Sequence, residues 1–267
     1  DSKQAPPSIH AFLESPELYD ASAEILHQAS NAEGDTALYL AAKVGNEAAV
    51  RALLAVRDKT DCDKQNHKGI TPLSIAAHKG KVEVVRLLLA QRPMPAVNRA
   101  SNNGSTPLIQ ASHFGHVDVV DLLVAAGSAV DLANKKGTTA LMRATQEGNE
   151  AVVRRLVAAG ADVNVRNNER MNALMLGSQR GHANIVKALI DHRAEIDGQT
   201  AQGSTALMLA CKRGHLDVVR VLLTAGAEMH GQDSRGRTAR DTAERRRHAK
   251  IIELLSGSAQ NRLMQVR

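Results

Sequence analysis

One short motif recurs seven times along the 267-residue chain. It reads GDTALYLAAKVGN at its first occurrence and GSTPLIQASHFGH at its third. The Thr or Asn at its third position falls at 36, 71, 106, 139, 172, 205 and 238, so the period is 35 residues twice and then 33 residues four times. A second apolar block follows each copy, such as VDVVDLLVAAG after the third. A fixed period of this length predicts a row of stacked units instead of one central core.

Each unit has the pattern of two short helices joined by a turn and followed by an extended loop. In the third unit, Val117, Val120, Leu123 and Val124 recur at helical spacing. The Thr before each first helix can cap the free backbone amides with its side-chain oxygen, and the Gly two residues earlier permits a turn with positive φ. A single unit cannot bury its apolar face, so we expect stability to come from stacking against neighbouring units.

The residue content suits many small helix contacts. Aromatic residues make up only 1% of the chain, so the core must be built from Leu, Val, Ile and Ala. The 43% hydrophobic and 23% charged fractions are typical of a soluble folded chain. The longest apolar stretches fall far short of the roughly 20 residues that a membrane-spanning helix needs, and no signal peptide is visible at the start. We expect an intracellular protein, in the cytoplasm or nucleus, and a chain starting at Asp1 that is part of something longer.

These units resemble the ankyrin repeat, whose pattern reads G-x-T-P-L-H-x-A-A-x-x-G-H-x-x-V-V-x-L-L-L-x-x-G-A-x-x-N. The third copy matches it closely, with Gly104, Thr106, Pro107, Leu108, Ala111, Gly115, His116, Val119, Val120, Leu122, Leu123 and Gly127 in place. The resemblance implies an all-α solenoid of stacked helix-turn-helix units with extended loop fingers. It also implies a non-catalytic scaffold for protein-protein interaction, whose partner is set by the variable positions.

The resemblance divides the chain into three parts. Residues 1–30 are expected to form a linker and a capping helix over 16–29, which starts at the Ser15-Pro16-Glu17 signal. The repeat domain covers 31–255, with repeats near 31–65, 66–100, 101–133, 134–166, 167–199, 200–232 and 233–255. Polar residues in the last repeat are typical of the closing end of a solenoid. Residues 256–267 form a C-terminal tail that leads away from the domain.

Repeat five departs most from the pattern. It has Arg170 where Gly is expected, Asn172 in place of Thr, and Gly177 inside its first helix. A positive φ at a non-Gly residue and a Gly within a helix each cost on the order of 1 kcal/mol. We predict that repeat five is the softest part of the array. The alternative is that Arg170 adopts a different turn with no mechanical consequence.

Candidate binding residues are the variable ones, because in the family the loop tips and the exposed ends of the first helices line one concave face. At the helix ends these are His78, Lys79, His113, Phe114, Gln146, Glu147, Gln179, Arg180, Lys212, Arg213, Arg245 and Arg246, and at the loop tips Lys135, Lys136, Met171, Arg235 and Arg237. Phe114 is a large apolar side chain at a position expected to be exposed, which makes it the best candidate for an anchor. Towards the C-terminus the helix ends become a ladder of Arg and Lys.

The charge distribution indicates what this ladder would bind. Residues 1–133 hold 12 Lys and Arg against 15 Asp and Glu, whereas residues 134–267 hold 22 against 13. A basic half attracts anions, and Arg binds carboxylate or phosphate with two parallel hydrogen bonds. We therefore predict that a monomeric chain binds an acidic or phosphorylated segment of an intracellular partner. Two alternatives remain: the basic half binds nucleic acid or anionic lipid, or the array selects substrates for a larger enzyme.

No catalytic or metal-binding pattern stands out. The sequence has no GxSxG, Walker, HExxH or GxGxxG motif, so we expect no enzyme and no cofactor. His116, His182 and His215 share the family position after Gly, and we interpret them as structural residues, not as metal ligands. Cys211 is expected to be buried and Cys62 exposed, about four repeats apart and too far for a disulfide.

Two further sets of residues have a structural and a functional interpretation. Met142, Met175 and Met208 recur at repeat spacing and either pack between repeats, which we favour, or form an adaptable binding stripe. Asn98 and Asn164 share the position that ends each family unit. Their ordinary role is to hold the loop, but in some ankyrin proteins the Asn there is a substrate for an intracellular asparaginyl hydroxylase.

Overall fold

Pairs of short helices make up the computed structural model, which describes residues 13–15, 30–56, 61–92 and 94–256. The helices are α3 (Ala37–Val44), α4 (Glu47–Ala55), α5 (Pro72–Lys79), α6 (Val82–Leu89), α7 (Pro107–Phe114), α8 (Val117–Ala125), α9 (Ala140–Glu147), α10 (Glu150–Ala158), α11 (Ala173–Arg180), α12 (Ala183–Asp191), α13 (Ala206–Arg213), α14 (Leu216–Thr224), α15 (Ala239–Arg245) and α16 (Ala249–Leu255). Apart from one isolated bridge between Ser30 and Thr36, the described residues contain no β-structure. The prediction of an all-α solenoid is confirmed.

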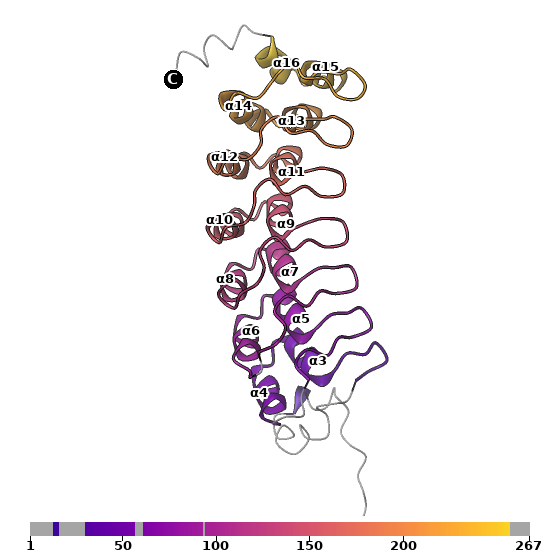
Figure 1. Ribbon diagram of the computed structural model, residues 1–267, viewed down its shortest axis with the longest axis vertical. Helices are drawn as coiled ribbons and strands as arrows, with labels where there is room; N and C mark the ends of the chain where they lie inside the picture. Colours follow the sequence, from indigo (N-terminus) through magenta and orange to yellow (C-terminus); the bar gives the residue numbers. More distant parts are fainter. Residues whose placement is uncertain (1–12, 16–29, 57–60, 93, 257–267) are drawn as a thin grey trace, which may run out of the picture. The chain divides into compact units, whose positions relative to one another are not determined.

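The chain divides into two compact units, Asp1–Lys135 and Lys136–Arg267. In the first unit, α3, α5 and α7 pack in one row and α4, α6 and α8 in another (Figure 1). In the second unit, α9, α11, α13 and α15 form the row of first helices, and α10, α12, α14 and α16 form the row of second helices. Each unit is therefore two layers thick, because every repeat contributes one helix to each layer.

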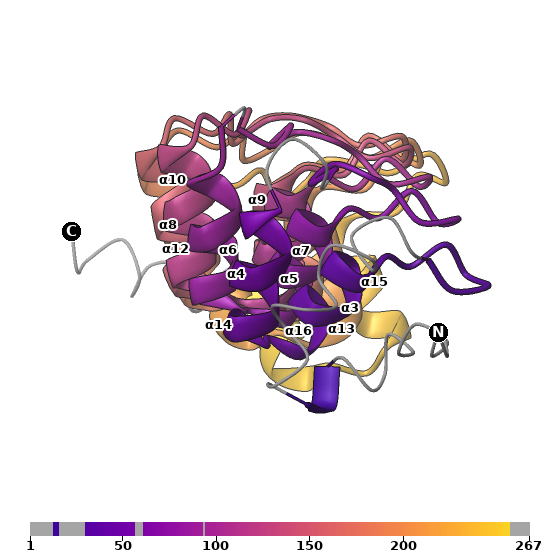
Figure 2. The ribbon, with the colours of Figure 1, turned by 90° about the horizontal axis from the view of Figure 1, so that it is seen from below.

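Side-chain caps start the first helices as the sequence predicts. In all seven repeats the Thr or Asn accepts a hydrogen bond from the backbone N–H three residues later. Thr36, for example, accepts from the backbone N–H of Tyr39 at 3.1 Å. The loops that precede these helices project to the same side within each unit (Figure 2). Their tips are joined by backbone hydrogen bonds, such as Ser234 N to Gln202 O at 3.0 Å.

The family-position histidines are structural, as predicted. The Nε2 atom of His116 lies 3.1 Å from the carbonyl oxygen of His78, and Nε2 of His215 lies 3.1 Å from that of Gln179. Because a carbonyl oxygen only accepts, Nε2 must carry the proton in each case. His182 makes a longer contact of the same kind, at 3.4 Å to Gln146. Each ring thus ties its repeat to the preceding one.

Aliphatic side chains and methionines fill the core. Met142, Met175 and Met208 are at most 4% exposed, which confirms that they pack between repeats. Cys211 is also buried as predicted, and burial raises the pKa of its thiol to about 12. The prediction for Cys62 is wrong, because this side chain is half-buried. Burial, followed by the charges of Asp63 and Asp61, raises the pKa of Cys62 to about 11.

Both chain ends fall largely outside the described residues. This applies to the predicted capping helix over 16–29 and to residues 257–267 of the tail. Close to the start, the Asn46 side chain donates a hydrogen bond to the carbonyl oxygen of Leu13 at 3.1 Å. The N-terminal segment therefore reaches the first helix pair at Leu13.

Repeat five stores backbone strain in two turns. Arg170 has a φ of 59°, in the left-handed region that glycines occupy in other repeats, so it does not adopt a different turn. Arg193 has a φ of 64°, at the place after the second helix where Gly127, Gly160 and Gly226 occur. An L-residue in this region costs roughly 1 to 2 kcal/mol. That repeat five is the softest part of the array stays a prediction, and this strain is its physical basis.

Arg170→Gly should stabilise the protein by about 1 kcal/mol, because glycine adopts the left-handed turn without a Cβ clash. Urea unfolding would measure the gain, and amide hydrogen exchange should show slower opening of repeat five. Arg220→Gly is the control, because it places a Gly inside α14 and should destabilise by about 1 kcal/mol. A loss of stability in Arg170→Gly, or equal exchange protection of repeats four to six in the wild type, would contradict the strain account.

Candidate functional site

The predicted helix-end residues of the second unit lie at the C-termini of its first helices. Glu147, Arg180, Lys212 and Arg213 close helices α9, α11 and α13 and are exposed. Helix α15 is shorter and ends at Arg245, so Arg246 becomes its C-terminal cap. Gln146 and Gln179 lie one residue earlier than Glu147 and Arg180 and are half-buried. These helix-end side chains are therefore mostly exposed, and that they line one face for a partner stays a prediction.

Part of this ladder faces a groove of about 710 Å³ between the loop tips and the ends of α11, α13 and α15. Its basic side chains are Lys212, Arg235, Arg237, Arg245 and Arg246, and its buried apolar side chains are Met171, Met208 and Leu209. We call this feature the basic groove. It brings together residues that the sequence places in three different repeats.

Gln179, a predicted residue, also lines the groove, but several other lining residues were not predicted. These are Glu169, Thr200, Gln202, Ser204, Asp233, Ser234 and Thr242. Most lie in the loops, at positions such as 169 and 202 that recur every 33 residues. Because these residues occupy the same position in successive repeats, the sequence could have predicted that they line one surface. Their polar side chains, however, are typical of any loop. Gln146, Glu147, Arg180 and Arg213 do not line the groove, although they share the ladder.

Arg237 is bound to its own loop. Its guanidinium contacts Oδ2 of Asp233 at 2.5 and 2.8 Å, and the backbone N–H groups of Arg235 and Arg237 donate to Oδ1 at 2.9 and 3.0 Å. Burial of Asp233 opposes ionisation, but these hydrogen bonds outweigh it and lower the pKa of Asp233 to about 2. We therefore assign Arg237 to bracing the loop and not to contacting a partner.

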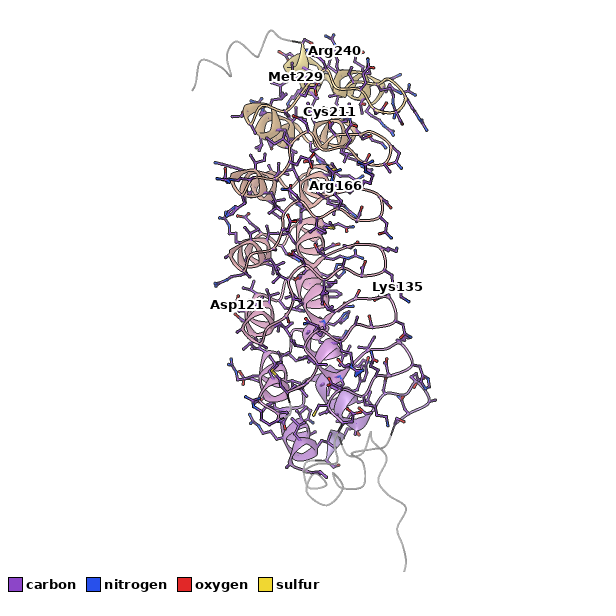
Figure 3. The ribbon with its side chains drawn as sticks, in the orientation of Figure 1. Asp121, Lys135, Arg166, Cys211, Met229 and Arg240 are labelled. Carbon is purple, nitrogen blue, oxygen red and sulfur yellow. The ribbon has the colours of Figure 1, made fainter. Side chains whose placement is uncertain are left out.

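The remaining cations of the groove have no acidic partner in the part of the chain that the structure describes. Among the described residues, no carboxylate lies within ion-pair distance of Lys212, Arg235, Arg245 or Arg246. In contrast, Arg240 on the same helix as Arg245 pairs with Glu244 at 2.8 Å (Figure 3). The groove thus concentrates positive charge that the carboxylates of the described residues do not neutralise.

Met171 is buried, with 6% of its surface exposed, so its expected position at an exposed loop tip is wrong. The loop from Asn167 closes on itself, because Asn167 N donates to Met171 O and Met171 N donates to the Asn167 side chain, both at 2.9 Å. Met171 and Met208 both line the groove. Met171 therefore contributes apolar surface to the groove instead of a protruding anchor.

The first unit carries a separate aromatic cluster around Phe114, which is 45% exposed as predicted. The His78 and His113 rings meet Phe114 edge-on, with centroids 4.3 and 4.5 Å away. Burial lowers the pKa of His78 despite its hydrogen bond to the Gln110 side-chain oxygen at 3.2 Å. A neutral His78 leaves this patch apolar at its centre, with the exposed Lys79 beside it.

Loop residues account for the other candidates. Lys135 and Lys136 are exposed, and Figure 3 shows Lys135 on a loop, away from the row of first helices. Asn98 accepts a hydrogen bond from the backbone N–H of Ala129 at 3.0 Å. Asn164 accepts from Glu195 N at 2.8 Å and donates to a carbonyl oxygen at 3.2 Å. The loop-holding role of both asparagines is confirmed, and their hydroxylation stays a prediction.

The part of the chain that the structure describes contains neither a cluster of metal ligands nor a membrane-spanning helix. No group of three or more His, Cys, Asp or Glu side chains lies close enough there to hold a metal ion. None of the helices described there is both long and apolar enough to span a bilayer. The groove and the Phe114 cluster are therefore the features that carry a functional argument.

A family model described as ankyrin repeats, three copies, matches residues 9–94, 56–133, 91–167, 118–200, 153–233 and 174–263. The chain belongs to the ankyrin-repeat family. Its fold is similar to the crystal structure of the human ASB11 ankyrin repeat domain, with a TM-score of 0.74 and 21% identity over 82% of this chain and 97% of that one. A search of curated proteins finds no match to the sequence. Ankyrin repeats generally mediate protein-protein interactions and are generally non-enzymatic modules.

Proposed function

We propose that this ankyrin domain is a non-catalytic scaffold that binds an acidic or phosphorylated segment of an intracellular partner protein. The observation that carries the proposal is the basic groove, where Lys212, Arg235, Arg245 and Arg246 lie without a carboxylate partner among the described residues. Polar side chains such as Gln202 and Ser234 line the same groove. An anionic segment would therefore meet cations and neutral hydrogen-bonding groups together.

Hydrogen bonds from the arginines favour a bound anionic peptide segment over unbound counter-ions from solution. Hydrogen bonds to charged groups contribute about 1.5 to 3 kcal/mol each, and Arg can make two parallel bonds to one carboxylate or phosphate. Two arginines next to each other at the end of α15 supply two such forks. A competing explanation is that Lys212 and Arg245 only offset the helix macrodipole, which favours cations in the last turn by about 0.3 to 1 kcal/mol. That explanation predicts no ligand.

The Phe114 cluster of the first unit would supply a second, apolar contact for the partner. Its large exposed ring is held by His78 and His113, so little side-chain freedom is lost when a partner covers it. Exposed aromatic residues are frequent energetic anchors of protein interfaces. We assign His78, Lys79, His113 and Phe114 to this contact.

A salt series with a labelled peptide library rich in Asp and Glu tests the proposal. Acidic peptides should bind, their Lys-rich counterparts should not, and affinity should fall as NaCl concentration rises, because the contacts are ionic. Random duplex DNA and anionic vesicles are measured in parallel as the alternative ligands. Equal affinity for acidic and basic peptides, or tighter binding to DNA or vesicles, would contradict the proposal.

A further inference from the structure

The basic groove carries more positive charge than a single carboxylate would balance. Its lining includes five cations and two carboxylates, Glu169 and Asp233, which leaves an excess of three positive charges. Asp233 is already engaged by Arg237 at 2.5 Å, so its charge is not available to the other cations. Four cations therefore face one uncommitted carboxylate across a groove of about 710 Å³.

Three of these cations can meet at one point. Lys212 and Arg245 hold equivalent positions, 33 residues apart, on the packed helices α13 and α15, and Arg246 directly follows Arg245. Packed helices lie about 8 to 10 Å apart, so long side chains from both can converge on a ligand between them. Arg246, the C-terminal cap of α15, lines the groove together with Arg245.

A phosphate monoester fits this arrangement better than a carboxylate. It carries a charge of about −1.5 to −2 at neutral pH and three strongly accepting oxygens. Neutral donors line the groove beside the cations, among them Thr200, Ser204 and Ser234. A phosphate could use these donors together with two guanidinium forks, whereas a carboxylate has only two oxygens to offer.

We infer that the basic groove recognises a phosphoserine or phosphothreonine in a partner segment, with Lys212, Arg245 and Arg246 around the phosphate. This inference rests on the proposed function and narrows its ligand. The groove of about 710 Å³ extends well beyond the space of one phosphate group, so the ligand is a peptide segment and not a free phosphate ester.

The test uses an oriented peptide library with Ser, Glu or phosphoserine fixed at the centre, and binding to the whole chain is measured by fluorescence anisotropy. The phosphoserine library should bind about tenfold more tightly than the Glu library, and the Ser library should bind least. Equal binding of the Glu and phosphoserine libraries would overturn the phosphate inference and leave the proposed function standing. Failure of both libraries to bind would overturn the proposed function itself.

A charge-conserving variant distinguishes the paired hydrogen bonds of arginine to phosphate from attraction by positive charge alone. Arg245→Lys with Arg246→Lys keeps both charges but removes the forks, so the preference for phosphoserine over Glu should fall to about twofold or less. Arg220→Lys with Arg240→Lys, outside the groove, is the matched control and should keep the full preference. Free phosphoserine should compete only weakly. An unchanged preference in the groove variant, or free phosphoserine binding as tightly as the peptide, would overturn the inference.

Discussion

Replacing Arg245 and Arg246 by Glu should weaken binding of an anionic peptide to the basic groove by about two orders of magnitude. The change removes two charge-assisted contacts, each worth about 1.5 to 3 kcal/mol, and even the low end of their sum, about 3 kcal/mol, is slightly more than a hundredfold in affinity. Both side chains are exposed, so the fold should tolerate the change. The helix would lose at most about 1 kcal/mol, through the unfavourable charges at its C-terminus. Fluorescence anisotropy measures the affinity, and a thermal melt reports whether the protein is folded.

The matched control reverses two charges outside the groove. Lys187 on α12 and Arg220 on α14 are exposed and do not line the groove, and their replacement by Glu changes the net charge by the same amount. This variant should keep nearly the wild-type affinity, since long-range attraction is screened within about 10 Å at ordinary salt. Equal weakening by both variants would show that overall charge governs binding, and the groove assignment would be wrong.

Gly181→Ala should destabilise the second unit by about 2 to 3 kcal/mol. Gly181 ends α11 with a φ of 88°, and a side chain in this conformation costs roughly 1 to 2 kcal/mol. An added Cβ would also lie 2.6 Å from Nδ1 of His215, so the ring would have to move. That movement breaks the hydrogen bond from His215 to the carbonyl oxygen of Gln179, worth about 1 kcal/mol. Urea unfolding with linear extrapolation measures the change.

Gly226→Ala isolates the contribution of the histidine. Gly226 has a φ of 91°, but an added Cβ would meet nothing within 4 Å among the described residues. Its replacement should therefore cost only the backbone strain, roughly 1 to 2 kcal/mol. In a background with His215→Ala, Gly181→Ala should lose its extra cost and match Gly226→Ala. Equal losses for both glycines in the wild-type background would contradict the proposed clash.

The sequence was sufficient for the fold because the signals are local and repeated. Thr caps and left-handed glycines define each helix pair within a single unit, and stacking neighbouring units requires no long-range pairing to be guessed. The motif identified Arg170 as a departure from Gly but left a different turn open, and the φ of 59° excludes that turn. The burial of the methionines was predicted in the same way, because a side chain that points inward at the same position of every repeat packs against the neighbouring repeat.

The groove was only partly predictable, because it depends on how loops and helix ends direct individual side chains. Arg237 was expected to contact a partner, but its guanidinium binds Asp233, four residues earlier. The repeat pattern does not predict which side chains of one loop form an ion pair. Met171 is buried because its loop closes through Asn167. Arg246 lines the groove whereas its counterpart Arg213 does not, and α15 ends one residue earlier than α13, which the motif does not reveal.

Amide hydrogen exchange of the whole chain, with and without a saturating anionic peptide, tests most directly whether the basic groove is the recognition site. We expect slower exchange in the loops and helix ends around residues 199–213 and 232–246, and no change in α10, α12 and α14. Protection confined to those second helices, or no protection at saturation, would contradict the account.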